Sequence, residues 1–271
     1  RDRSNRLPIL FLPGDTYANR MPDPVLQQVE HFSNPGMTAN DSFKPVTKYF
    51  DRITRPEQII QSLPQAIQTM LDPADTGPAC LSLCQDVQGE IFDYPEEFFK
   101  ERIHNIRRPK PDDFQIKQAM EKIKKSKKPI IISGGGVFYS DAMDELGSFA
   151  IKHNIPVTQT VMGYSTMKRD HSHFLGPIGG LGGKAANNLA KETDLAICVG
   201  TKLADFTTGS WANFENPEFK LVSINIARHD ANKHLAEAVI GDAKVCLSEL
   251  SNSLGNWKSP DSWHKKSQDE L

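Results

Sequence analysis

The sequence has little of what would tie it to a membrane or to a strongly charged partner. No apolar run approaches the roughly 20 residues that a membrane span needs. The 32 basic and 34 acidic residues leave a formal net charge of −2. That balance gives no reason to expect a nucleic acid or a membrane surface as a partner. With 38% hydrophobic and 24% charged residues, the composition instead predicts a soluble globular protein.

Cysteine is scarce as well. The four residues are Cys80, Cys84, Cys198 and Cys246, and no second pair or histidine pair stands at the spacing of a zinc site. We therefore expect four buried, reduced thiols. Such thiols suit a reducing compartment, so the expected location is cytoplasmic.

The first of three expected regions covers residues 1–108. Its last part, from Tyr94 onward, reads as an excursion and linker. Its other elements are expected as strands at 7–12 and 79–83, a turn at 13–15, a helix at 23–31, and a helix that begins at Pro56 and ends before Asp72.

The second region, residues 112–250, alternates strand and helix signals, which favours a mostly parallel sheet with helices on both faces. Helices are expected at 114–125, 141–154, 183–192 and 243–254, and strands at 129–133, 156–160, 194–200, 220–226 and 238–240. The polar residues 255–271 lack periodicity, so we expect 251–271 to be a linker to a domain outside the chain.

Glycines follow the first strand of the second region. Gly134, Gly135 and Gly136 precede a helix, where they could let the backbone approach a phosphate. A dinucleotide fingerprint would require a further glycine where Tyr139 stands, and no acidic residue closes the next strand. A tight structural turn is the favoured interpretation, with nucleotide contact as the alternative.

A second glycine-rich stretch at 179–184 suggests a phosphate loop only superficially. Ile178 stands where the P-loop glycine should be, and Ala185 replaces the hydroxyl residue. We therefore reject nucleotide hydrolysis. Thr201 and Asp205 follow a strand, where ligands of open α/β sheets bind, but a polar loop tip predicts the same residues.

The remaining polar candidates have ordinary explanations. His171 and His173 lack a third metal ligand, so we expect solvated loop histidines. Helix capping or turn formation accounts for the acidic residues that follow strands, which are Asp15, Asp86 and Asp242. No Gly-x-Ser-x-Gly motif supports serine hydrolysis.

Longer stretches carry a family resemblance. They include Asp-Ser-Phe-Lys-Pro-Val-Thr-Lys-Tyr-Phe-Asp-Arg at 41–52, Pro-Ile-Ile-Ile-Ser-Gly-Gly-Gly at 129–136 and Asp-Leu-Ala-Ile-Cys-Val-Gly-Thr-Lys-Leu at 194–203. Their order over residues 7–250 resembles the thiamine-diphosphate (ThDP) enzymes of the acetohydroxyacid synthase and pyruvate oxidase group. The resemblance implies part of a pyrimidine-binding α/β domain, then a Rossmann-like central domain with a mostly parallel six-stranded sheet.

Two stretches, at 13–30 and 86–99, are similar to the branch of this family that acts in inositol catabolism. The resemblance implies hydrolytic opening of a cyclic 1,2-dione to a deoxyglucuronate, with ThDP, Mg²⁺ and a homo-oligomeric assembly. The family's activating glutamate has no counterpart here. Its Gly-Asp-Gly and Asn-Asn motif has none either, because Ala243 follows Gly241-Asp242. We expect an inactive internal fragment that carries no catalytic, ThDP or metal residue and no cofactor of its own.

Two alternatives remain open. The chain could be a segment of an acetohydroxyacid synthase-like carboligase that holds FAD, or a non-catalytic nucleotide-binding module. Some members of the family bind FAD or ADP on the central domain, and the resemblance implies that such a nucleotide would contact Gly134–Gly136, Thr201 and Asp205. The first region is also expected to leave a strand edge unpaired and to be less protected in hydrogen exchange than 112–250.

Overall fold

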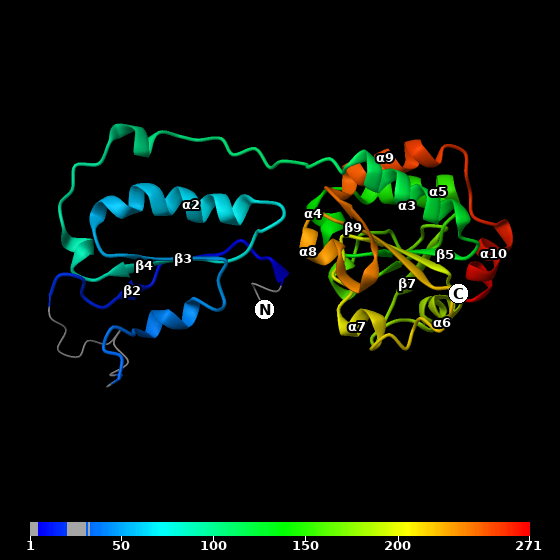
Figure 1. Cartoon of the computed structure of the whole chain (residues 1–271), viewed down its shortest axis with the longest axis horizontal. Coiled ribbons are helices and arrows are strands. Elements are labelled where there is room, and N and C mark those ends of the chain that lie inside the picture. Colours follow the sequence, from blue (N-terminus) through cyan, green and yellow to red (C-terminus); the bar gives the residue numbers. More distant parts are fainter. Residues whose placement is uncertain (1–4, 21–30, 32) are drawn as a thin grey trace. The chain divides into compact units, whose positions relative to one another are not determined.

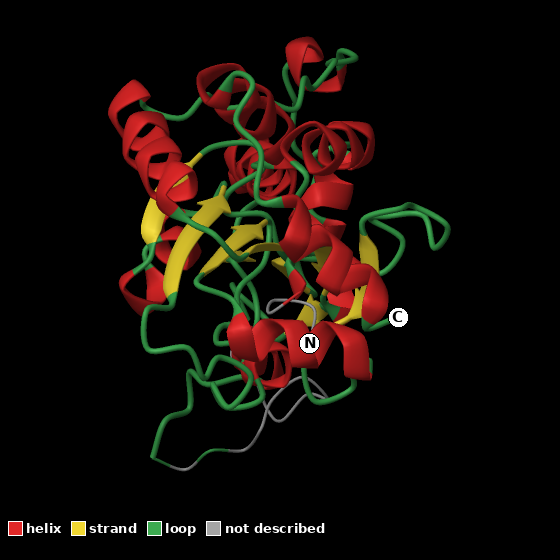
Figure 2. Ribbon diagram, turned by 90° about the vertical axis from the view of Figure 1, so that its right-hand side faces the viewer, coloured by secondary structure: helices red, strands yellow, loops and turns green. Residues whose placement is uncertain are grey.

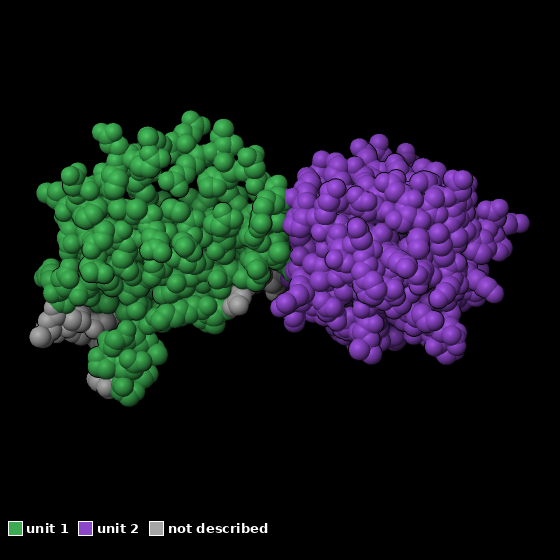
Figure 3. Space-filling view, turned by 45° about the horizontal axis from the view of Figure 1, so that its top comes forward, with its two compact units in different colours: residues 1–107 green, residues 108–271 purple. Residues whose placement is uncertain are grey.

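The computed structural model describes residues 5–20, 31 and 33–271, and the chain divides into two compact units at Arg107 and Arg108 (Figure 3). Apart from His31, the helix predicted over 23–31 lies outside the described residues. No helix among the described residues is long and apolar enough to cross a membrane.

The first unit is built around one buried strand, β4 (Ala79–Cys84). β3 (Tyr49–Ile53) pairs along one side of it, while β1 (Leu10–Phe11) and β2 (Gly14–Asp15) pair with its two ends on the other side. All pairings are parallel, and α2 (Ile59–Leu71) lies along one face of the sheet (Figure 1). Short helical turns complete the unit: η1 (Ala39–Phe43), η2 (Pro56–Gln58), η3 (Val87–Gly89) and η4 (Glu96–Phe99).

The turn predicted at 13–15 is wrong. Gly14 and Asp15 are extended and pair with Leu83 and Cys84, and the amide of Leu83 donates to the Pro13 carbonyl at 2.9 Å. The Asp15 carboxylate is fully buried there because it has partners on the neighbouring strands.

The second unit contains a six-stranded parallel sheet in the order β10-β9-β8-β5-β6-β7. This confirms the predicted α/β class with a mostly parallel six-stranded sheet. The strands are β5 (Pro129–Ser133), β6 (Val157–Gln159), β7 (Phe174–Pro177), β8 (Leu195–Val199), β9 (Lys220–Asn225) and β10 (Glu237–Ile240).

Helices cover both faces of this sheet (Figure 2). Because successive side chains of a strand point to opposite faces, Ile131 packs with α3 (Asp113–Lys125), α5 (Met143–His153) and α9 (Ala243–Leu254). Ile130 and Ile132 pack on the other face with α6 (Lys184–Glu192) and α10 (Asp261–Asp269). Shorter elements follow the strands: α4 (Gly135–Tyr139), η5 (Val161–Gly163), α7 (Asp205–Thr208), α8 (Arg228–Ala231) and η6 (Lys233–Leu235).

The lack of periodicity in 255–271 predicted a linker, but this polar stretch contains regular structure. It contains α10, whose Trp263 is 3% exposed and donates its indole N–H to the Pro129 carbonyl at 2.9 Å. Lys266 pairs with Glu192, and the Lys128 ammonium lies over the Trp263 ring. A single buried tryptophan with polar anchors holds the helix, and such a pattern leaves no apolar periodicity to detect.

We predict that amides of β4 exchange faster than those of β5 and β8. The apolar clusters around β4 are small, whereas β5 and β8 lie between two large clusters. Opening of a unit with less buried apolar surface requires less free energy. Hydrogen exchange of the 271-residue chain, read by mass spectrometry, measures this, and equal protection of the three strands would contradict it.

Candidate functional site

The candidate residues lie where the strand order of the six-stranded sheet reverses. From β5 the chain continues through β6 to β7 on one side, and β8 begins the other half through β9 to β10. Ligands of open α/β sheets bind outside the carboxyl ends of strands at this kind of position. Gly134 follows β5 and Thr201 follows β8, so the fold brings the two predicted loops together.

The glycines serve this close approach. A Cβ on Gly134 would lie 2.4 Å from the carbonyl oxygen of Gly200, and one on Gly136 would lie 2.6 Å from Gly200 Cα. The amide of Gly134 donates to the Val199 carbonyl at 2.8 Å, and that of Gly136 donates to the Gly200 carbonyl at 2.9 Å. Two of the three amides that could face a phosphate are therefore already engaged within the backbone.

Thr201 and Asp205 are likewise bonded within their own loop. Thr201 is 6% exposed, and its hydroxyl accepts from the Leu203 amide at 3.3 Å. Its carbonyl accepts from the side-chain amide of Asn225 at 3.1 Å. Asp205 is exposed at the start of α7, where its carboxylate accepts from the Ser210 hydroxyl at 2.8 Å. The geometry thus brings Gly134 and Gly136 against Gly200 and Thr201, while Asp205 presents an exposed carboxylate farther along the same loop.

We expect Gly134→Ala to destabilise the second unit by about 1–3 kcal/mol, because the added methyl would collide with backbone atoms that have no room to move. Gly180→Ala is the matched control, since its nearest neighbour would lie at 3.9 Å. Denaturant unfolding followed by tryptophan fluorescence reports the second unit, which holds Trp211, Trp257 and Trp263. Equal stabilities of the two variants would show that the close approach is unimportant.

The second glycine-rich stretch is also held internally. The side chain of Asn187 accepts from the Gly179 amide at 2.9 Å and donates to the Gly179 carbonyl at 3.0 Å. Gly179 has a φ of +103°, and a Cβ there would lie 2.0 Å from the Phe206 carbonyl oxygen. The loop is therefore a close contact between two chain segments.

A charged network that the sequence did not indicate lies in the first unit. Arg52 of β3 donates to Asp15 at 2.7 Å and to Asp41 at 2.9 Å. The Ser82 hydroxyl donates to the Asp15 carboxylate at 2.5 Å, and the Asn40 side chain donates to Ser82 at 2.7 Å. Turn formation is therefore an incomplete explanation of Asp15. Polar residues on four separate segments gave no common pattern from which this cluster could be found.

The network lowers the pKa of both of its carboxylates. Burial alone would raise the pKa of Asp15, but hydrogen bonds from Ser82 and Arg52 outweigh it and hold the pKa below its usual value. Burial acts in the same direction on Asp41, where Lys44, the Thr38 amide and Arg52 lower the pKa to about 2. Both carboxylates are thus charged at neutral pH. Asp242 is a helix cap as predicted, since it accepts from the amides of Lys244 and Val245. Asp86 caps the Val87 amide, but it also accepts from the amides of Ala18 and Asn19 at 2.9 and 2.8 Å, so capping explains it only in part.

The expectation of solvated histidines is wrong for His173. This side chain is 7% exposed, and its ring stacks on that of His264 from α10 at 4.1 Å between centroids. Its Nδ1 lies 2.9 Å from the Ser172 hydroxyl and its Nε2 lies 3.3 Å from the Asn154 side-chain oxygen. Burial, and then the neighbouring His264 and His171, lower its pKa to about 4. His173 and α10 lie far apart in the sequence, so no local pattern predicts this pairing.

The four cysteines are free and buried, which confirms the predicted thiols. Burial raises the pKa of Cys80 and Cys84 to about 11 and that of Cys246 to about 12, and it also raises the pKa of Cys198. Within the described residues, no group of three or more His, Cys, Asp or Glu side chains could hold a metal ion. The raised pKa values keep the four thiols protonated at neutral pH, so none of them is a reactive thiolate.

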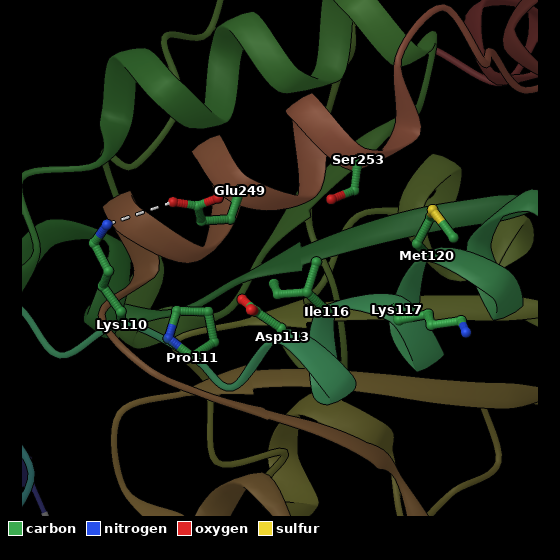
Figure 4. A pocket seen from close by; sticks show the side chains of 8 residues that line it. All are labelled: Lys110, Pro111, Asp113, Ile116, Lys117, Met120, Glu249 and Ser253. Carbon is green, nitrogen blue, oxygen red and sulfur yellow. Dashed lines mark ion pairs between the residues drawn. The ribbon is translucent and has the colours of Figure 1, made fainter.

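A pocket of about 490 Å³ lies between α3 and the second half of α9, and none of the candidate residues lines it (Figure 4). Lys110 and Glu249 face one another across it at 3.9 Å. Its lining consists of Lys110, Pro111, Asp113, Ile116, Lys117, Met120, Glu249 and Ser253. Its lining mixes charges of both signs with a few apolar side chains, so it does not indicate a particular ligand or reaction.

Comparison with known proteins supplies the family. Residues 116–250 match the family profile described as thiamine pyrophosphate enzyme, central domain. The chain is similar to 3D-(3,5/4)-trihydroxycyclohexane-1,2-dione hydrolase of Clostridium perfringens, with 50% identity over 92% of this chain. It is also similar to the proteins of the same name from Clostridium tetani, with 49% identity over 93% of the chain, and from Bacillus licheniformis, with 46% identity over 94%.

The chain spans 39% of the length of the Clostridium relatives and 40% of that of the Bacillus relative. The matched region contains the six-stranded sheet and the switch-point loops described above. Residues 116–250 are a thiamine pyrophosphate enzyme central domain, and the chain belongs to the thiamine pyrophosphate enzyme family.

Proposed function

We propose that this chain is part of a ThDP-dependent hydrolase that opens the ring of 3D-trihydroxycyclohexane-1,2-dione to 5-deoxy-glucuronate in myo-inositol degradation. The observation that supports this most is the identity of about half of all aligned residues, over nine-tenths of the chain, with proteins of that name. In this proposal residues 1–108 are the latter part of the pyrimidine-binding domain with its linker, and residues 112–250 are the central domain.

The described residues do not fit ThDP or Mg²⁺. Asp242 is the nearest approach to a diphosphate and metal motif, but its carboxylate caps α9 and accepts from Arg108 at 3.1 Å. The asparagine pair is engaged too, since Asn187 holds Gly179 and Asn188 donates to Glu270 at 2.8 Å. ThDP would supply an electron sink for carbon–carbon bond cleavage, and we propose that residues outside this chain hold it with its Mg²⁺.

The proposed role of this chain is therefore positional. The interlocked loops at Gly134–Gly136 and Gly200 fix the carboxyl edge of the central sheet, and the Asp15–Arg52 network fixes the sheet of the first unit. A scaffold of this kind sets the shape of an assembly around a cofactor while taking no proton and forming no bond. By itself the chain should not catalyse the reaction.

The test is an assay of the whole protein in the presence of ThDP and Mg²⁺. We expect it to convert the cyclic dione into the ring-opened acid, followed by NMR, and to leave pyruvate unchanged. Condensation of pyruvate together with a bound, yellow FAD would favour the carboligase alternative instead. If the whole protein converts neither substrate, both proposed ThDP-dependent activities are contradicted.

The nucleotide hypothesis for Gly134, Gly135, Gly136, Thr201 and Asp205 stays a prediction. Its supporting observation is the position of these residues at the switch point, although the amides of Gly134 and Gly136 are engaged. Titration of FAD and of ADP against the purified chain, followed by thermal shift, decides it. An Asp205→Ala variant is the control, and absence of a shift at millimolar nucleotide would remove the hypothesis.

A further inference from the structure

The segment that joins the two units changes character at Arg108. Residues 101–107 are exposed and contain no helix or strand (Figure 1). Within the described residues, none of their backbone groups makes a hydrogen bond to another backbone group. Arg107, whose side chain is 72% exposed, pairs with Asp72 at 3.2 Å, and exposed pairs of this kind contribute little stability. Little therefore holds this stretch in one conformation.

Arg108, in contrast, is bound to the rest of the second unit. Its guanidinium Nη1 donates to the Ser140 carbonyl and also, at 3.1 Å, to Oδ2 of Asp242. Ser140 lies between α4 and α5, and Asp242 lies between β10 and α9. One side chain therefore ties the incoming chain to two separate turns of the second unit.

The two oxygens of the Asp242 carboxylate have separate partners. Oδ1 accepts from the amides of Lys244 and Val245 and caps α9, while Oδ2 accepts from Arg108. The Asp242 side chain is only 5% exposed, so its charge has little access to water. Without Arg108 the carboxylate would keep its helix cap but lose its cation, which makes the ion pair favourable.

The backbone next to this ion pair is held in the same place. The Asp242 amide donates to the Pro109 carbonyl at 2.9 Å. Gly241 permits this approach, because a Cβ there would lie 3.0 Å from the Pro109 carbonyl oxygen and 3.0 Å from the Pro111 nitrogen. The two prolines have fixed φ angles, so the segment 108–111 has few other conformations.

We propose that Arg108 and Asp242 form a clamp that fixes residues 108–111 to the second unit, so that the linker bends at 101–107. Hinges are short stretches whose residues absorb large changes in φ and ψ. Residues 101–107 can do so because, in the described part of the chain, no backbone hydrogen bond restrains them. Residues 108–111 cannot, because their movement would break the ion pair with Asp242 and the hydrogen bond to Pro109 together. The clamp thus sets the point at which the linker leaves the second unit.

Nitroxide labels on introduced cysteines compare the two parts of the linker in the 271-residue chain. Ile103→Cys and Lys110→Cys provide labelling sites, since Ile103 is 85% exposed and the Lys110 side chain is 78% exposed. The four native thiols are buried and stay unlabelled. In electron paramagnetic resonance spectra we expect a mobile label at 103 and a restricted label at 110. Equal mobility at the two positions would overturn the proposal.

Arg108→Gln tests the clamp itself, with Arg107→Gln as the matched control. Loss of the charged hydrogen bonds should raise the exchange rate of the Asp242 amide, read by NMR, roughly tenfold or more, and it should free the label at 110. Arg107→Gln should change neither, and denaturant unfolding followed by tryptophan fluorescence checks that both variants fold. A wild-type exchange rate or a still restricted label in Arg108→Gln would show that the clamp does not hold the linker. The test needs no substrate, so failure of the hydrolase assay leaves the proposal unaffected.

Discussion

Replacing Arg52 by alanine is expected to lower the free energy of unfolding of the first unit by about 3–5 kcal/mol. Asp15 is fully buried, and Arg52 is the cation that pairs with it, with 2.7 Å between guanidinium Nε and carboxylate Oδ2. Without the guanidinium, a charged carboxylate stays buried with only neutral partners such as Ser82. The loss should appear as faster hydrogen exchange of the β4 amides.

Three comparisons make this result specific. Arg55→Ala should change stability by no more than about 0.5 kcal/mol, because the Arg55 side chain is 70% exposed and its partner Glu57 lies 3.6 Å away. Adding Asp15→Asn to Arg52→Ala should restore part of the stability, since the buried charge is then gone. Tryptophan fluorescence, which reports the second unit, should not change. If Arg52→Ala exchanges like the wild type, the network does not hold the first unit together.

Acidification should weaken the packing of α10, because protonation of the buried His173 is unfavourable. The folded pKa of about 4 lies below the ordinary 6.5, so between these values the unfolded chain binds the proton and the folded chain does not. The stabilisation is therefore complete above pH 6.5 and is lost as the pH falls towards 4. A shift of this size corresponds to about 3 kcal/mol, at about 1.4 kcal/mol for each pKa unit.

The stacked partner adds to this effect. Burial also lowers the pKa of His264, although Asp261 opposes it, so two neutral rings would become neighbouring cations at 4.1 Å between ring centroids. Thermal unfolding between pH 7 and pH 4 measures the loss, with His173→Gln and the exposed His229→Gln compared with the wild type. The first variant should be less sensitive to pH than the wild type, and the second should behave like it. Identical pH profiles for all three would contradict a neutral buried His173.

The core of the second unit could be predicted because its strands are buried on both faces. Ile130, Ile131 and Ile132 form a continuous apolar run, and such runs alternating with amphipathic helices have few alternative folds. β3 was missed for the opposite reason. Its Asp51 and Arg52 interrupt the apolar pattern, and they are tolerated because Ser62 and Asp15 satisfy them.

The position of the candidate site could be predicted, but whether its glycines serve a ligand or a backbone contact could not. A glycine after a strand signals either a ligand or a close backbone contact, and these differ only in what lies opposite. Gly200 lies opposite Gly134 and Gly136, and no local pattern reveals a neighbour 64 residues away from the closer of the two. The same holds for His173 and His264, which are joined only when α10 folds back onto the sheet.

We propose that this chain forms and positions the sheet scaffold of a ThDP enzyme and holds none of its cofactor. The most direct test is isothermal titration of ThDP with Mg²⁺ into the purified 271-residue chain, with the whole protein titrated in parallel. We predict no binding heat for the chain and saturable binding for the whole protein, because Asp242 and Asn187 are engaged in internal contacts. Stoichiometric binding of ThDP to the chain alone would show that the chain holds the cofactor itself.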